Sequence, residues 1–289
     1  MREQLQEHLT KRVNQCVANS RNTTCEKIER KKESLGKRKG EIVKAKATGN
    51  IINKVDDLET NKAYYRVHFQ YLIRHNGKLY MEEEIEERVA EFYKDVLVDD
   101  KELNPYEDNI DKPVEVLDKI DSEERSGFVY DRLSAVKYAE RWWNEYNPAY
   151  KSFEVNCTNY ISQCLHAGKA PMRGYPNRGN GWWMRNNNWS YSWTVANAMR
   201  LYLAGSKTGL RGKEVSDPRE LKIGDVICYD FQGDGRFDHT TIVTAKDGNG
   251  EPLVNANTFN SRMRYWAYED STAYTPNIKY KFFHIEDGQ

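Results

Sequence analysis

The first 39 residues are polar and charged, with a narrow apolar stripe that indicates a helix. The apolar positions recur every four residues, at Leu5, Leu9, Val13 and Val17, and this spacing places them on one helix face. The segment is predicted to be helical up to about Gly36 or Gly40. We expect the stripe to pack against a core or to mediate self-association, with membrane docking as the weaker alternative.

Residues 41–98 show the pattern of a small antiparallel sheet. The stretch from Ala63 to Ile73 is rich in aromatic and β-branched residues, which favour strands. Asn76-Gly77 follows it and is a strong hairpin signal, with a further short strand expected at 78–81. The acidic run from Glu82 to Val89 fits either a helix or a strand with a charged edge. Nothing in this segment indicates catalysis.

Helical patterns precede strand patterns in the remainder of the chain. A helix that begins at Tyr130 is expected to end before Asn147-Pro148, because proline disfavours helix at the residue before it. A short helix from Cys157, a long loop at 168–190 and a helix at 193–203 follow. Strands are then predicted at 225–231, 239–244 and 252–258.

The distribution of tryptophan and proline marks a domain boundary. All seven Trp lie from Trp142 onward, and all eight Pro lie from Pro105 onward. The composition changes within an acidic stretch. We therefore predict an N-terminal helix with a small antiparallel-sheet domain at 1–98, an acidic linker at 99–126 and a second domain at 127–289.

Charge is balanced over the whole chain but not along it. Lys plus Arg and Asp plus Glu number 44 each, so the basic footprint typical of nucleic-acid binding is absent. Residues 1–40 hold eleven basic and five acidic residues, whereas residues 81–125 hold six and eighteen. The simplest interpretation is a solvated helix and linker surface. The alternatives are a basic arm that contacts an anionic polymer, or pairing of the two segments with each other.

The sequence gives weak indications about the compartment. No apolar run is long enough to cross a bilayer, and the polar N-terminus lacks the apolar core of a signal peptide. The chain as it stands is therefore expected in the cytoplasm, or in the cell wall or outside the cell if a signal was removed. The five scattered cysteines do not form a disulfide pattern, which favours a reducing compartment.

Cys157 is the main candidate for chemistry. It is predicted in the first turn of a helix, where the helix dipole and unpaired N–H groups favour the thiolate. A cysteine nucleophile needs a base, and the base needs a group that orients it. His239 opens a later strand, and Asn257 lies on the strand after that, so the three can meet. The alternative for Cys157 is a buried structural cysteine.

Several motifs together resemble one family. They are Asn156 to Leu165, Gly181-Trp182-Trp183, Trp189 to Thr194, Leu221 to Ile227, Asp238-His239-Thr240 and Asn257-Thr258. This set resembles the "putative amidase domain" of Bacillus-type bacteria, over about residues 130–285. That family is in turn similar to the papain-like cysteine hydrolases and to the cysteine-, histidine-dependent amidohydrolases of cell-wall lysis.

The resemblance implies a papain-like α+β fold and hydrolysis of an amide bond in peptidoglycan or a related peptide. By position, Cys157 is the nucleophile, His239 the base and Asn257 the third group of the triad. Two positions depart from the family pattern. Asn156 stands where Asp is usual, and Asn257 stands where His is frequent. The second departure is compatible with activity, because an asparagine can hydrogen-bond an imidazole.

Groups around the triad are also predicted. The default oxyanion donor is the backbone N–H of Cys157, and a side-chain donor is open between Asn156, Lys151 and Asn147. Substrate contacts are expected from Asn156 and from Trp182 or Trp183 in the aromatic loop, because aromatic faces offer a large contact area.

No metal or cofactor is predicted. Residues 230–238 faintly resemble a calcium loop but lack the alternating oxygen ligands and the distal Glu. A tight turn that delivers His239 explains the segment better. Cys157, Cys164, His166 and His239 lack the spacing of a zinc site.

Three functions stay open at this point. The first is a cysteine amidohydrolase or peptidase. The second is a catalytically weak or inactive module that binds cell-wall or peptide ligands. The third is an intracellular transferase that uses the same thiol.

Overall fold

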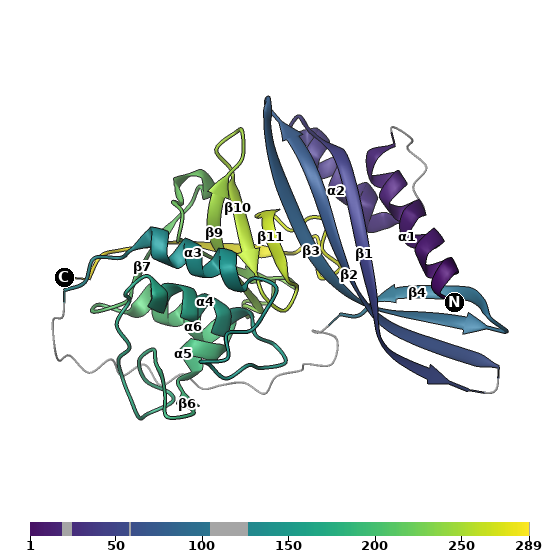
Figure 1. Ribbon diagram of the computed structural model, residues 1–289. Helices are drawn as coiled ribbons and strands as arrows, with labels where there is room; N and C mark the ends of the chain where they lie inside the picture. The colour runs from purple at the N-terminus through teal and green to yellow at the C-terminus, as the bar shows by residue number, and fades with distance from the viewer. Residues whose placement is uncertain (19–24, 58, 105–126, 289) are drawn as a thin grey trace.

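The computed structural model describes residues 1–18, 25–57, 59–104 and 127–288, and it shows a mixed α+β protein (Figure 1). Within these residues the helices are α1 (Arg2–Val17), α2 (Glu26–Lys37), α3 (Arg132–Trp142), α4 (Cys157–Ala167), α5 (Tyr191–Thr194) and α6 (Ala196–Gly205). A short 3-10 helix lies at Pro218–Glu220. None of the described helices is both long and apolar enough to span a membrane.

One antiparallel sheet of ten strands runs through both halves of the molecule. Its strands are β1 (Gly40–Asp56), β2 (Thr60–His75), β3 (Lys78–Tyr93), β4 (Val96–Glu102), β7 (Gly212–Val215), β8 (Val226–Asp230), β9 (His239–Lys246), β10 (Pro252–Ala256), β11 (Ser261–Tyr265) and β12 (Lys279–Ile285). The order is β1-β2-β3-β11-β10-β9-β8-β12-β7, with β4 also paired to β3. A separate ribbon joins β5 (Met184–Arg185) and β6 (Asn188–Trp189).

The two predicted domains share this sheet. Strand β3 pairs with β11 through Glu84 opposite Ser261 and Glu83 opposite Arg262. Of the predicted acidic linker, 99–102 belongs to β4, and 105–126 lies outside the described residues. The junction matters because β11 pairs with β10, and β10 pairs with β9, the strand that begins at His239.

Local sequence explains the long strands of the N-terminal half. Asn76 and Gly77 both have positive φ, 48° and 75°, as the tight turn between β2 and β3 requires. The run from Glu82 to Val89, left open between helix and strand, is part of β3. The single helix predicted for residues 1–39 is instead two helices, α1 and α2.

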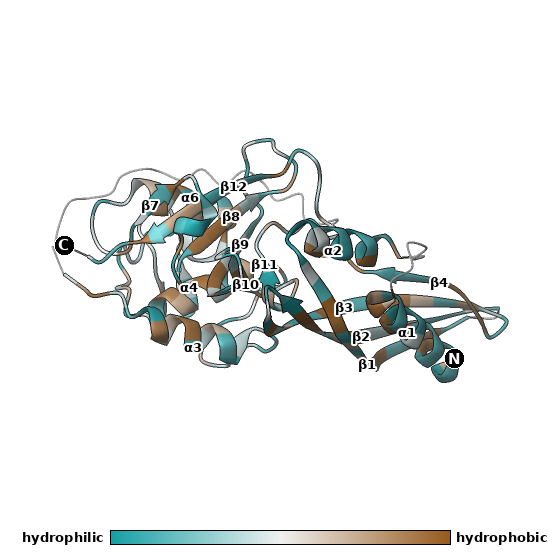
Figure 2. Ribbon diagram, turned by 90° about the horizontal axis from the view of Figure 1, so that it is seen from above, coloured by the Kyte–Doolittle hydropathy of each residue, from teal (hydrophilic) through white to brown (hydrophobic). Residues whose placement is uncertain are grey.

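The apolar stripe of α1 packs inside the molecule. Leu5 and Leu9 are buried in a core with Val67 and Phe69 of β2, whereas Val17 is exposed. Both α1 and α2 contact β1, and Figure 2 shows them lying across the long strands. Packing against a core is thus the use that the structure gives to this stripe.

The acidic residues of β3 are buried rather than solvated. Alternate positions of a strand share one face, so Glu82, Glu84 and Glu86 all face the helices and are at most 3% exposed. Glu86 contacts Arg12 at 3.0 Å and Lys27 at 2.7 Å, and Lys31 contacts Glu82. The expected solvated surface is wrong for these residues, and the alternative, pairing of the two charged segments, is confirmed.

The C-terminal half places the Cys157 helix against the sheet. Helix α4 contacts helix α3 and strands β9 and β10. Every residue of α4 from Cys157 to Leu165 is buried. Strand β8 is buried along its whole length, as the run of apolar residues there predicts. The result is a helix whose first turn is fixed beside the start of β9.

Candidate active site

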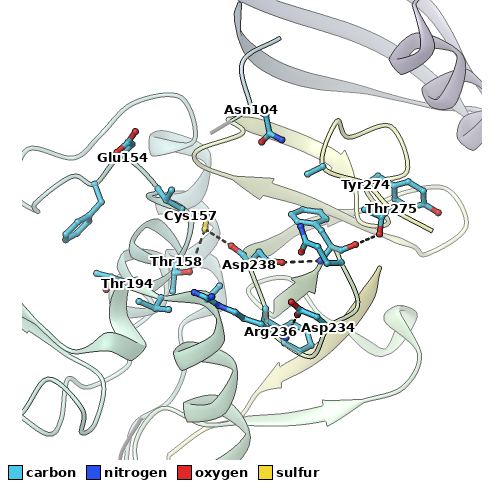
Figure 3. A pocket seen from close by; sticks show the side chains of 18 of the residues that line it. Asn104, Glu154, Cys157, Thr158, Thr194, Asp234, Arg236, Asp238, Tyr274 and Thr275 are labelled. Carbon is cyan, nitrogen blue, oxygen red and sulfur yellow. Dashed lines mark hydrogen bonds between the residues drawn. The ribbon is translucent and has the colours of Figure 1, made fainter. Parts of the chain in front are cut away.

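Cys157 is the first residue of α4 and lines a cleft of about 780 Å³ (Figure 3). Its sulfur lies 3.7 Å from Thr158 Oγ1 and 4.0 Å from the carbonyl oxygen of Asp238. The first N–H groups of a helix lack intrahelical acceptors, and the side chain of Asn156 does not cap them. The positive end of α4 therefore faces the cleft at the thiol.

The cleft walls combine aromatic and ionisable side chains. The aromatic ones are Phe153, Trp189, Phe231, Phe237 and Tyr274, and the ionisable ones besides Cys157 are Glu154, Asp234, Arg236 and Asp238. Figure 3 shows Glu154 and Tyr274 on different sides of Cys157. Both signs of charge and several apolar faces are thus within reach of a bound peptide.

His239 opens β9 and is fully buried. It follows Asp238, whose carbonyl oxygen lies 4.0 Å from the Cys157 sulfur. Its Nε2 lies 3.3 Å from the hydroxyl of Tyr268, and its ring packs against Tyr229, Phe231 and Tyr268. Burial lowers the pKa of His239 from 6.5 to about 3, and the positive charge of Arg264 acts in the same direction. The imidazole is therefore neutral at physiological pH.

Because His239 is held neutral, it should make the fold sensitive to acid. Between pH 6.5 and 3 the unfolded chain binds a proton that the folded chain excludes, so stability falls as pH falls. We expect His239→Gln to remove up to about 1.4 kcal/mol per pH unit from this slope. Urea unfolding at pH 4, 5, 6 and 7 measures it. Parallel curves for the two proteins would contradict the neutral, buried histidine.

Asn257 forms a hydrogen bond with Asn156 at the start of α4 and does not orient His239. Its Oδ1 accepts a hydrogen bond from Asn156 Nδ2 at 3.0 Å. Its Nδ2 points to the carbonyl oxygens of Trp142 and Trp143, at 3.4 and 3.2 Å. These bonds use both ends of the amide, so Asn257 acts on Cys157 through the residue before it.

Asn156 is likewise occupied within the protein. Its Oδ1 accepts hydrogen bonds from Phe153 N and Asn159 Nδ2, and its own N–H donates to Thr258 Oγ1. Only 3% of the residue is exposed. It therefore fixes the turn before Cys157, which corrects its predicted place as a substrate contact. An amide suits this position because it donates to Asn257 and accepts from the backbone.

The two tryptophans predicted to contact substrate lie away from the cleft. Trp182 and Trp183 are at most 1% exposed: Trp182 Nε1 donates to Ser162, and Trp183 Nε1 faces the carbonyls of Asn177 and Asn180. Both are part of the core, which corrects the prediction that one of them lines the cleft. Trp189 is the tryptophan that does so.

The side chains predicted as candidate oxyanion donors do not line the cleft at Cys157. Asn147, Lys151 and Asn156 line a small hollow on another side of α4. Asn147 Nδ2 donates to the Tyr138 hydroxyl. In the cleft itself, the hydroxyl of Thr158 lies 3.7 Å from the sulfur.

The turn between β8 and β9 is held by protein groups. Asp230 is fully buried and accepts hydrogen bonds from the backbone N–H groups of Gly233, Asp234 and Gly235. The segment thus forms the tight turn expected before His239. Among the described residues, no group of three or more His, Cys, Asp or Glu side chains is arranged to hold a metal ion.

Asp238 is an ionisable group of the cleft, and in the sequence it stands out only as part of the motif around His239. Burial raises its pKa to about 6, opposed by a hydrogen bond from the Phe231 N–H and assisted by Asp230 and Asp234. A carboxyl with such a pKa changes charge near neutral pH, a common property of functional sites.

Residues 129–283, which include this whole site apart from Asn104, match the family model described as "Putative amidase domain". The chain belongs to this family. It is 55% identical over 268 residues to YhbB of Bacillus subtilis (strain 168), described as an uncharacterized protein, and the match covers 90% of this chain and 86% of YhbB. No solved structure matches the chain.

A second relative matches a shorter stretch. YjcM of Bacillus subtilis (strain 168), also described as uncharacterized, is 33% identical over 126 residues, which are 40% of this chain and 28% of YjcM. Membership of the amidase family indicates a hydrolase, in agreement with the resemblance drawn from the motifs.

Sequence reasoning missed Tyr268, Thr158 and Asp238 in this amidase-family site. Thr158 and Asp238 stand within the motifs around Cys157 and His239, so those motifs gave a usable signal. Tyr268 lies in an irregular segment after β11 with a positive φ of 57°, and no motif marks it.

Proposed function

We propose that this protein is a cysteine-dependent amide hydrolase with Cys157 as nucleophile and His239 as base. The observation that carries the proposal is the position of the thiol. It sits at the start of α4, in a cleft, against the carbonyl of the residue that precedes His239. A papain-like arrangement is part of the proposal, and the packing of the Cys-bearing helix α4 against β9, which begins at His239, supports it.

The proposed reaction has two steps. His239 takes the thiol proton, the sulfur attacks the carbonyl carbon, and the C–N bond breaks as the imidazolium protonates the leaving amine. Water then attacks the thioester, giving its proton to His239, and the acid leaves as the thiol is restored. The backbone N–H of Cys157 is the proposed donor to the oxyanion.

Peptidoglycan or a related peptide is the proposed substrate. The cleft is large enough for several residues of an extended peptide and offers Arg236 for carboxylates, Asp234 and Glu154 for amines, and aromatic faces for apolar parts. Asn257 and Asn156 take the proposed role of fixing Cys157 at the helix start, through their mutual hydrogen bond.

Product analysis in isotopically labelled water tests the proposal. The protein is incubated with purified peptidoglycan and with soluble peptides released from it, in H₂¹⁸O. We expect a new amine, one ¹⁸O in the new carboxyl group, and an acyl adduct on the Cys157 peptide after acid quenching.

Two other outcomes discriminate the alternatives. Binding to peptidoglycan without cleavage would overturn the hydrolase and favour the inactive binding module, for which the low pKa of His239 is an argument because it opposes the imidazolium intermediate. Transfer of the acyl group to an added amine in preference to water would favour a transferase.

A further inference from the structure

We infer that Tyr268 is the residue that orients His239, the position for which the sequence suggested Asn257. This inference rests on the proposed function and specifies its third group. Asn257 directs both ends of its amide to Asn156 and to two backbone carbonyls. Tyr268 instead presents its hydroxyl to His239 Nε2, at 3.3 Å.

In this proposal Tyr268 accepts the hydrogen bond from His239 and donates to Ser261. Tyr268 and its second partner, Ser261 at 3.3 Å, are both buried. Burial raises the pKa of Tyr268 to about 12, so the phenol keeps its proton. A hydroxyl donates one hydrogen and accepts others. Donation to Ser261 leaves the Tyr268 oxygen free to accept from His239.

That direction selects one tautomer of the imidazole. If Nε2–H donates to Tyr268, Nδ1 is unprotonated and is the nitrogen that takes the thiol proton. Fixing the tautomer and the ring orientation is the task of the third group in such sites. A neutral hydroxyl suits a fully buried histidine, because a carboxylate there would itself have to be desolvated.

Tyr268 is in turn held from the N-terminal half. The Arg264 guanidinium lies 4.2 Å from its ring centroid and contacts Asp270 at 2.8 Å. Asp270 is paired at 2.6 Å with Lys31 of α2. A cation over an aromatic face is attractive, so this chain of contacts fixes the ring that faces His239.

The ionisable groups around His239 come from three elements. Tyr229 lies on β8, Arg264 is on β11 with Tyr268 after it, and Cys157 of α4 acts electrostatically on Tyr268. Tyr229 directs its hydroxyl to Thr241 and to the carbonyl of Trp266, not to His239. It therefore supplies a matched control: a buried hydroxyl beside the same ring but outside the proposed hydrogen bond.

The test compares Tyr268→Phe with Tyr229→Phe in the full chain. The ¹⁵N shifts of His239 report its tautomer, and the rate of Cys157 alkylation by iodoacetamide from pH 5 to 9 reports its activation. We expect wild type and Tyr229→Phe to hold the Nε2–H tautomer. Tyr268→Phe should populate both tautomers, and its alkylation at pH 7 should be slower by about tenfold or more.

The readouts separate this inference from the hydrolase proposal. Wild-type tautomer and alkylation profile in Tyr268→Phe would overturn the orienting role, even if the protein hydrolyses amides. A shifted tautomer in Tyr268→Phe, together with no amide cleavage by the wild-type protein, would support the orienting role and overturn the hydrolase proposal. Equal changes in both variants would show a general packing effect and would also overturn the inference.

Discussion

Cys157→Ala is expected to abolish amide hydrolysis, with a loss of at least about 10³-fold in rate, or about 4 kcal/mol of transition-state stabilisation. The reason is that the substitution removes the atom that forms the thioester, while the cleft and the start of α4 remain. The measurement is the release of new amines from a cleaved substrate. The acyl adduct seen after acid quenching should disappear with it.

A control on the same helix separates chemistry from folding. Cys164 lies seven residues later on α4 and is fully buried in the core. Cys164→Ala loses a small buried group and is expected to cost about 1 kcal/mol of stability, with hydrolysis kept within a few-fold. Wild-type hydrolysis in Cys157→Ala would rule out this nucleophile.

The parts of the site that the sequence predicted are those with local causes. A cysteine at a helix start follows from the Asn-Pro turn before it, and His239 follows a turn closed by Asp230 and glycines. Both depend on residues close in sequence, so their elements can be predicted. Which side chain meets His239 depends on where the segment after β11 lies, and this is a tertiary property.

The aromatic loop shows a second limit. Composition identifies Trp182, Trp183 and Trp189 as a cluster but does not say which of them is inside. The indole N–H of Trp182 finds Ser162 on α4, and that partner decides its burial. A buried indole needs an acceptor, and the acceptor lies on an element distant in sequence.

The fold of the N-terminal half was ambiguous for a related reason. In β3, glutamates occupy both faces, so alternation of polar and apolar residues is lost between 82 and 87. The face with Glu83 and Glu87 contacts Arg262 and Arg66, while the other face meets the cations of α1 and α2. Only the partners, which come from distant segments, distinguish the buried face.

The buried network around Glu86 gives the second large expected effect. Glu86 is 1% exposed and lies between Arg12, Lys27 and Arg88. Glu86→Gln leaves these cations without their central anion, and breaking a buried ion pair costs about 3–5 kcal/mol. Urea unfolding at pH 7 measures the loss. Glu87→Gln is the matched control, because Glu87 pairs with Arg66 on the exposed face of the same strand; it should cost less than about 1 kcal/mol.

The pH dependence of this loss has a defined sign. Burial alone would raise the pKa of Glu86, but Lys27, Arg12 and Arg88 outweigh it and hold the pKa well below its usual value of 4.5. A depressed carboxyl pKa contributes stability above pH 4.5 that is lost as the pH falls further. The difference in stability between wild type and Glu86→Gln should therefore be largest at pH 7 and shrink below pH 4.

Helix α2 connects this network to the candidate site. Its Lys27 pairs with Glu86, and its Lys31 pairs with Asp270, which contacts Arg264. Glu86→Gln should therefore also slow Cys157 alkylation. Equal stability of the Glu86→Gln and Glu87→Gln proteins would mean that the network contributes nothing to the junction of the two halves.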